Sequence, residues 1–187
     1  MTIPQRFAVK FFVQDKDAAS VDLDAFMPIF QRWIQHHTVE GMLIDVVDYK
    51  HVKNGPGMVL IGHEADYALD MRDGRPGMQY TLKRDATGDF AERLQNAVQK
   101  ALRACQAIEE EKALKGAVTF ALDEVEVVLL DRLRVPNDEE SYNALQGDLQ
   151  TVLGDIQAER LHTDARYPLT IRAKIVGASR LETVLSS

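Results

Sequence analysis

The pattern of apolar and polar positions divides the first 84 residues into short apolar runs separated by turn residues. Residues 6–14 are rich in aromatic and β-branched side chains, which is typical of a β-strand. Residues 54–57 and 73–77 are rich in glycine and proline, which indicates tight turns. Together these signals predict five strands, at residues 6–14, 42–52, 58–61, about 66–71 and 78–84.

Two segments repeat apolar residues at the spacing of three and four that marks an amphipathic helix. The first stripe covers residues 26–34, and Asp24 is its expected N-cap. The second covers residues 90–108, where Asp89 and Glu92 have the spacing of a capping box. Both helices would turn one apolar face toward a core.

The last third of the chain predicts one more helix and further strands. Residues 142–156 carry the third apolar stripe, with Asn137 as the expected N-cap and Glu140 completing a capping box. The expected strands are 118–122, 125–133, 158–164 and 169–176, the first two being separated at Asp123-Glu124. The tail after Gly177 fits either a short helix or an edge strand.

The chain contains an internal repeat. A shift of 116 residues without a gap places Val9 on Val125 in the strands and Trp33 on Leu149 in the helices. Because strand and helix coincide in the same register, a duplicated β-α-β-β unit is favoured. We therefore predict an α+β fold built as a tandem β-α-β-β duplication with ferredoxin-like order. Its sheet would be largely antiparallel, with helices mainly on one face.

The repeat also predicts the domain organisation. Residues 1–122 would form a ferredoxin-like module with an inserted hairpin near 66–84, and residues 123–187 a second β-α-β-β module packed against the first. A chain of 187 residues can bury a full core, so the two modules are expected to form one compact unit.

Charge and composition narrow the range of partners. The formal net charge of -7 argues against general nucleic-acid binding, which depends on Lys and Arg neutralising phosphates, and against an anionic membrane surface. No run approaches the ~18 consecutive apolar residues of a membrane span, and the N-terminus resembles a strand more than a signal peptide. The single cysteine, Cys105, excludes an intrachain disulfide, so a cytoplasmic location is expected.

Four of the five histidines lie within residues 36–67. If the turn at 54–57 is an even-length loop centred on Gly55-Pro56, Asp48 lies opposite His63 across the hairpin. A carboxylate beside an imidazole fixes its tautomer and raises its pKa, which suits a general base, and Tyr49 is a further catalytic candidate. A structural ion pair on the sheet surface is the simpler explanation and is preferred.

The strand at 169–176 belongs to the locally basic part of the chain. Arg172 and Lys174 would share one face of this strand by alternation, and Arg160 lies on the preceding strand. These side chains could bind an anionic ligand or an acidic partner. A solvated outer face of the sheet explains the same pattern and is preferred.

Strong catalytic signatures are absent from the sequence, including a Gly-rich phosphate loop, His-Glu-x-x-His and Gly-x-Ser-x-Gly. We therefore expect a cytoplasmic, non-enzymatic protein that binds a small ligand or another protein without a cofactor, and a homodimer is one of the assemblies compatible with this expectation. The alternative is an enzyme of the isomerase, lyase or hydrolase type, with His63 as a general base oriented by Asp48. A second alternative is a metal-binding protein that uses the histidines and carboxylates of residues 36–67, although alternation separates His51 from His63.

Overall fold

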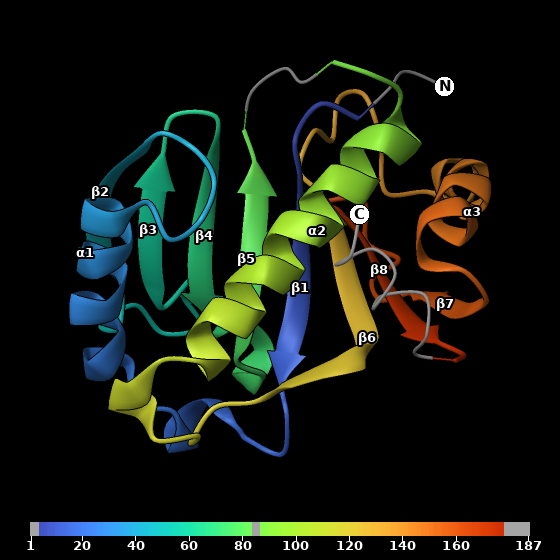
Figure 1. Cartoon of the computed structure of the whole chain (residues 1–187). Coiled ribbons are helices and arrows are strands. Elements are labelled where there is room, and N and C mark those ends of the chain that lie inside the picture. Colours follow the sequence, from blue (N-terminus) through green and yellow to red (C-terminus); the bar gives the residue numbers. More distant parts are fainter. Residues whose placement is uncertain (1–3, 84–86, 178–187) are drawn as a thin grey trace.

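An antiparallel sheet organises the fold (Figure 1). The computed structural model describes residues 4–83 and 87–177, which form eight strands and three α-helices, so the protein is α+β as predicted. The strands are β1 (Phe7–Val13), β2 (Leu43–Asp48), β3 (Met58–Gly62), β4 (Ala65–Asp70), β5 (Gly77–Leu82), β6 (Phe120–Leu129), β7 (Ile156–Arg160) and β8 (Leu169–Ile175). The helices are α1 (Phe26–His36), α2 (Phe90–Glu109) and α3 (Glu139–Leu153). The predicted tail after Gly177 lies outside the described residues.

The strands follow the order β2-β3-β4-β5-β1-β6-β8-β7 across the sheet. The hairpin predicted as an insertion is β4–β5, and it lies within the sheet between β3 and β1. Strands from both predicted modules belong to this sheet and meet where β1 pairs with β6, with Lys10 opposite Glu126. The module boundary at residue 122 stays a prediction.

One face of the sheet, called the helix face below, is apolar and lies under the helices (Figure 1). Alternation turns Phe7, Val9 and Phe11 of β1 toward it, and all three are fully buried. Helix α2 packs over β1 and β5, α1 over β2 and β3, and α3 over β7 and β8. Their apolar stripes form one continuous core, in which each fully buried large side chain contributes roughly 1.5–3 kcal/mol.

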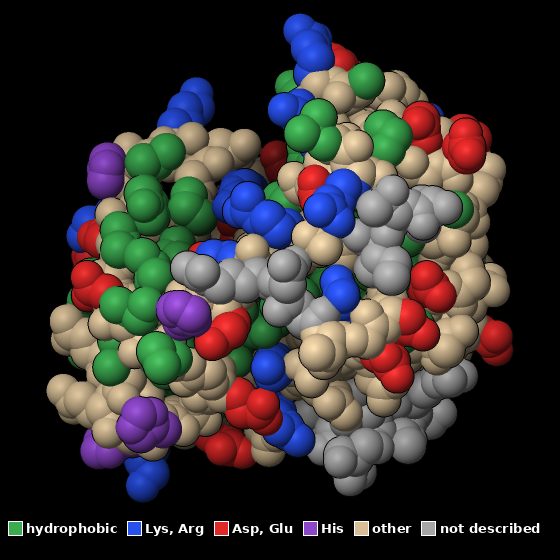
Figure 2. Space-filling model, turned by 90° about the horizontal axis from the view of Figure 1, so that it is seen from above, with side chains coloured by type: hydrophobic (Ala, Val, Ile, Leu, Met, Phe, Trp, Pro, Cys, Tyr) green, Lys and Arg blue, Asp and Glu red, His purple; other side chains and the backbone are tan. Residues whose placement is uncertain are grey.

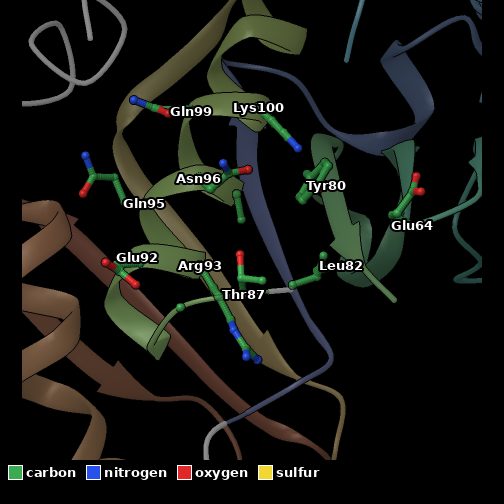
Figure 3. A pocket seen from close by; sticks show the side chains of 12 residues that line it. Glu64, Tyr80, Leu82, Thr87, Glu92, Arg93, Gln95, Asn96, Gln99 and Lys100 are labelled. Atoms are coloured by element: carbon green, nitrogen blue, oxygen red, sulfur yellow. The ribbon is translucent and has the colours of Figure 1, made fainter. Parts of the chain in front are cut away.

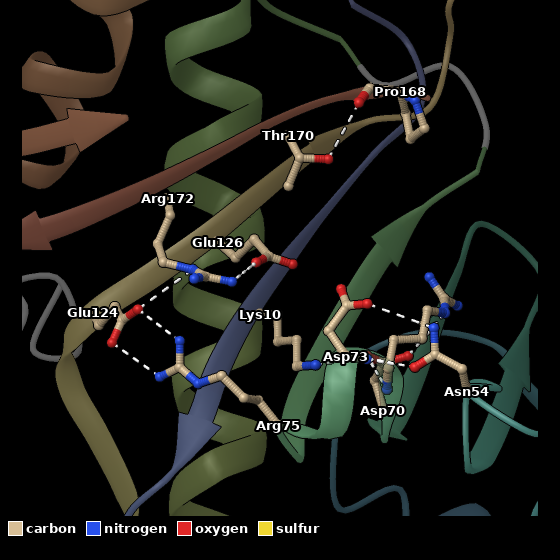
Figure 4. Close-up of polar contacts among 11 residues, drawn as sticks. Lys10, Asn54, Asp70, Asp73, Arg75, Glu124, Glu126, Pro168, Thr170 and Arg172 are labelled. Atoms are coloured by element: carbon tan, nitrogen blue, oxygen red, sulfur yellow. Dashed lines mark hydrogen bonds and ion pairs between the residues drawn. The ribbon is translucent and has the colours of Figure 1, made fainter. Parts of the chain in front are cut away.

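The opposite face, called the open face, carries none of the described helices, and Figure 4 views the sheet from this side with α2 behind it. Alternation turns Ala8, Lys10 and Phe12 of β1 toward it. The register gives further open-face residues: Asp66, Ala68 and Asp70 of β4, Gly77, Gln79 and Thr81 of β5, Glu124, Glu126 and Val128 of β6, and Thr170, Arg172 and Lys174 of β8. Many of them are charged, so this face is polar.

Strand β6 corrects one prediction, because it runs unbroken through Asp123-Glu124. The charged dipeptide does not end the strand because Glu124 faces the open side, where Arg75 binds it. Val125, the next residue, stays fully buried in the core. Alternation therefore accommodates the charge without loss of the strand.

The predicted caps are confirmed only at α2, where Asp89 and Glu92 form a capping box. Helix α1 follows a short 3-10 turn and has no side-chain cap, so the prediction of Asp24 is wrong. Helix α3 is capped by Asp138 instead of Asn137. These differences shift the two helix starts by one residue each and leave the apolar stripes unchanged.

Candidate functional site

A groove of about 800 Å³ opens on the helix face between α2, strand β5 and the β3–β4 turn (Figure 3). The lining residues are Glu64, Tyr80 and Leu82 on the sheet side, Thr87 and Gly88 before α2, and Glu92, Arg93, Gln95, Asn96, Ala97, Gln99 and Lys100 on α2. Most of these side chains can form hydrogen bonds. The groove is therefore suited to a polar ligand.

Helix α2 contributes both to the core and to this groove because its two sides differ. Leu94 and Val98 belong to the apolar side and are fully buried. Arg93, Asn96 and Lys100 are spaced three and four residues apart, which aligns them along an adjacent strip of the helix surface. Figure 3 shows Lys100 extending from α2 toward Tyr80 on the sheet.

Two tyrosines form the sheet side of this region. Tyr80 and Tyr67 meet edge to face, with ring centroids 5.2 Å apart, and the hydroxyl of Tyr67 donates to the carbonyl of Glu40 at 2.9 Å. Burial, followed by the charges of Glu40 and Glu64, raises the pKa of Tyr80 to about 12. Its phenol therefore stays neutral at physiological pH. The Nζ atom of Lys100 lies 5.7 Å from the Tyr80 ring centroid, within cation–π range.

His63 lies at the turn between β3 and β4, beside the groove residue Glu64. Its Nδ1 atom lies 3.0 Å from Glu64 Oε1, and both side chains are about half exposed. The hydrogen bond with His63 is the main cause that lowers the pKa of Glu64. Glu64 is therefore an anion at neutral pH, at the sheet side of the groove.

The predicted pair of Asp48 and His63 is not formed. Asp48 lies opposite Met58 in the β2–β3 register, whereas His63 follows the end of β3. The predicted register of this hairpin is wrong because the connection is longer than a tight turn. Residues 49–57 form a loop that contains hydrogen-bonded turns. Tyr49 lies at the start of this loop and is exposed. The structure therefore does not bring the three catalytic candidates together.

The open face holds an ion pair that is removed from solvent (Figure 4). The Nζ atom of Lys10 on β1 lies 2.6 Å from Oδ2 of Asp70 on β4, and the two side chains are 3% and 2% exposed. Strand β5 lies between them, and its Gly77 leaves room for the Lys10 side chain. A glycine in the interior of a strand is typical of such a close approach.

A second group of charges lies beside this ion pair. Arg75 donates two hydrogen bonds to Glu124, at 2.9 and 3.0 Å, and Arg172 donates to Glu126 at 2.8 Å. The guanidinium group of Arg75 stacks over the Phe12 ring, 3.8 Å from its centroid. The hydrogen bonds from Arg75 are the main cause that lowers the pKa of Glu124. These contacts form a largely neutralised network.

The three basic residues singled out in the sequence do not share one site. Arg172 and Lys174 line an open-face groove of about 460 Å³ together with Arg75. Arg160 pairs with Ile171, so it lies on the helix face, and its Nη2 atom is 3.5 Å from Glu139. This open-face groove is only weakly cationic, because Arg75 and Arg172 already bind Glu124 and Glu126.

The histidines are dispersed over the surface. Figure 2 shows the visible histidine side chains spread over the left part of the molecule, not gathered in one cluster. Within residues 4–83 and 87–177, no group of three or more His, Cys, Asp or Glu side chains is placed to hold a metal ion. The metal-binding alternative therefore has no geometric support in this part of the chain.

Comparison of the chain with protein-family models, curated proteins and solved structures finds no match. None of the helices described in the structure is long and apolar enough to cross a membrane. The function must therefore be argued from the chain's own residues.

The groove residues Tyr80, Asn96 and Lys100 were not singled out from the sequence. On a helix, a polar strip next to an apolar stripe normally faces solvent, so Asn96 and Lys100 carried no distinct signal. Their role depends on the separation of α2 from α1 across the sheet, which is a tertiary feature. Only Glu64 belongs to the histidine-rich segment that the sequence indicated.

Proposed function

We propose that this protein binds a small zwitterionic ligand, a free amino acid or a dipeptide, in the groove between α2, strand β5 and the β3–β4 turn. One observation carries the proposal: Lys100 and Glu64, which have opposite charges, flank the buried Tyr80 in a groove of about 800 Å³ (Figure 3). A volume in this range is typical of small-molecule sites. The proposed role is binding without chemical change of the ligand.

The side chains of the groove suit the two ends of such a ligand. The ammonium group of Lys100 would bind the ligand carboxylate, and the Glu64 carboxylate would bind the ligand ammonium. The amides of Asn96 and Gln99 can donate and accept, which matches a peptide group. The opposite charges of the groove select against a ligand that carries only one sign of charge.

We favour binding over a catalytic role for His63, because Asp48, the carboxylate predicted to orient His63, does not lie beside it. Asp48 lies opposite Met58 in the sheet, and one partner of His63 is Glu64, an exposed neighbour in the same turn. An exposed pair of this kind contributes little to stability and orients an imidazole poorly. The enzyme hypothesis therefore has less support than the binding hypothesis.

The experiment is a calorimetric titration of the purified protein with the proteinogenic amino acids and glycylglycine, compared with Lys100→Ala and Glu64→Gln. We expect saturable binding of at least one compound, weakened about tenfold by either substitution because a charge-assisted hydrogen bond is lost. Lys112→Ala, which removes an exposed lysine outside the groove, is the matched control. Absence of binding at about 10 mM, or equal weakening by Lys112→Ala, would reject the proposal.

The predicted duplication belongs to the same proposal, with β1-α1-β2-β3 and β6-α3-β7-β8 as two related β-α-β-β units of ferredoxin-like order. The repeat shift of 116 residues maps Lys10 onto Glu126, and these two residues lie opposite each other where β1 pairs with β6. About this pair the strands of the two units follow one another outward in the same order, β1-β3-β2 and β6-β8-β7, which supports the duplication. The units do not superpose strand for strand, because β4 and β5 separate β3 from β1 while β8 pairs directly with β6. A cytoplasmic location is also proposed, on the basis of the single, buried Cys105.

A further inference from the structure

The open face contains a depression of about 280 Å³, on the other side of the sheet from the groove. Ala8 of β1 and Ala68 of β4 contribute only methyl groups to it, while Val59, Ile61 and Val128 provide further apolar surface. Arg72, which follows β4, supplies a cation. An apolar site with a few polar groups is typical of a small-molecule pocket.

The two alanines account for the hollow in the middle of the sheet. Ala8 lies opposite Thr81 on one side and Val128 on the other, and Ala68 lies between Val59 and Gln79 in the register. Alanine is depleted in strands, where larger side chains pack against their neighbours. Both alanines are almost fully buried although none of the described helices covers this face. The surrounding side chains therefore rise around them.

Arg72 is held in place by the buried ion pair of the open face. Its Nε atom lies 3.1 Å from Asp70 Oδ1, and its backbone N–H donates to Asp70 Oδ2 at 3.3 Å. Asp70 is in turn bound to Lys10. Because Nε makes the contact with Asp70, the two Nη groups are the atoms that can donate a forked pair of hydrogen bonds to a carboxylate.

We infer that this depression binds a compact monocyclic carboxylate, with its apolar body over Ala8 and Ala68 and its carboxylate on Arg72. A cavity of about 150 Å³ accepts benzene, so 280 Å³ has room for one ring and a short polar group. The other charged residue of the pocket, Asp66, has its carboxylate 2.7 Å from Lys83 Nζ, which offsets its repulsion of an anion. Gln79 and Thr81 add groups that can bind a ring substituent.

The experiment is a titration of the full-length protein with benzoate, 2-furoate and cyclohexanecarboxylate, followed by two-dimensional NMR of the backbone amides. We expect saturable shifts at the amides of Ala8, Ala68 and Arg72, with dissociation constants below about 10 mM. Benzamide has nearly the same shape without the charge, and we expect it to bind about tenfold more weakly. The helix-face groove lies across the sheet, so the two sites fail or succeed independently.

Substitutions locate the site. Arg72→Gln is expected to weaken benzoate binding about tenfold, while Arg166→Gln, at an exposed arginine, leaves it unchanged. Ala68→Val fills the depression and is expected to abolish binding, whereas Gln157→Val, on the same face of β7 outside the pocket, leaves it intact. Folding of each variant is checked by its amide spectrum.

Three results would overturn the inference. The first is no saturable shift with any of the three carboxylates in the folded wild-type protein. The second is shifts confined to the α2 groove or to scattered surface residues. The third is benzoate binding that folded Arg72→Gln and Ala68→Val proteins retain at wild-type strength.

Discussion

Lys10 on β1 and Asp70 on β4 form a buried ion pair across the intervening strand β5, with 2.6 Å between Nζ and Oδ2. Both side chains are at most 3% exposed, although they lie on the face of the sheet that carries none of the described helices. Taking two charges out of water costs several kcal/mol per ion, and good geometry only partly offsets it. We expect such a pair to be retained where it positions another side chain, and here Asp70 also contacts Arg72.

Breaking this pair is expected to be costly. Asp70→Leu should lower the free energy of unfolding by about 3–5 kcal/mol, because Lys10 is left as an uncompensated buried charge. The double variant Lys10→Met with Asp70→Leu should lose less than the single variant, since no charge then remains buried. Urea denaturation of the three proteins measures the difference. A double variant that is less stable than Asp70→Leu would contradict the prediction, because it would show that unpaired Lys10 is not a destabilising buried charge.

Gly77 and Gly147 should respond to alanine in opposite directions. At Gly77 an added Cβ would lie 2.5 Å from the Phe11 carbonyl oxygen and 2.7 Å from Lys10 Cε, so Gly77→Ala should destabilise by about 1–3 kcal/mol. Gly147 lies within α3, where an added Cβ meets nothing within 4 Å, so Gly147→Ala should stabilise by about 0.5–1 kcal/mol. Thermal unfolding of both variants tests this, and a shift in the same direction would contradict the argument.

The helices and most strands could be predicted because hydrophobic periodicity is a local property. Helix α2 is the clearest case, since its apolar stripe and the Asp89–Glu92 capping box are both visible in the sequence. The cap of α3 was misjudged because the Asn137 amide donates to the carbonyls of His162 and Asp164, both from the β7–β8 connection. Such a tertiary contact leaves no local signal.

The candidate site was less predictable because it depends on register and on the spacing of helices. The length of the β2–β3 loop was predicted wrongly because Gly57 was assigned to a tight turn. Gly57 has a φ of 68° and lies so close to the Leu69 carbonyl that a side chain would clash. It belongs to the end of a longer loop and not to a tight turn. Consequently the predicted register paired Asp48 with His63 incorrectly. Tyr80 was overlooked for a separate reason, because the groove that it lines depends on how α2 packs on the sheet.

Tyr80 should make the protein sensitive to alkali. Its pKa is about 12 in the folded protein and about 10 in the unfolded chain, so the unfolded chain loses this proton first as the pH rises. The stabilising effect of the neutral buried phenol is fully present below about pH 10 and is lost as the pH rises toward 12. Burial also raises the pKa of Tyr67, which acts in the same direction.

The expected slope is of the order of 1 kcal/mol per pH unit for Tyr80 between about pH 10 and 12. Urea unfolding of the wild type and Tyr80→Phe at several alkaline pH values measures it. The Phe variant should show the shallower decline. Tyr142→Phe is the control, since Tyr142 is only partly buried and lies outside the groove. Parallel curves for the wild type and Tyr80→Phe would contradict the prediction.

Asp45 is expected to keep the edge strand β2 from pairing with another chain. β2 is the last strand on its side of the sheet, and Ile44 on it is 56% exposed. Because the Tyr49 N–H bonds inward to β3, alternation directs the Val46 N–H toward the open edge, where Asp45 Oδ1 accepts it at 2.8 Å. Asp45→Ala would leave this donor available for a strand from a second copy.

We therefore expect Asp45→Ala to self-associate more strongly than the wild type, by roughly tenfold in dissociation constant, since each copy gains one intermolecular hydrogen bond. Sedimentation velocity over a range of protein concentrations measures this, and it also tests the predicted homodimer in the wild type. Glu140→Ala removes the same charge from an exposed position on α3, so it separates the effect of the edge from that of net charge. Equal association of the two variants would show that charge, and not the protected edge, controls the contact.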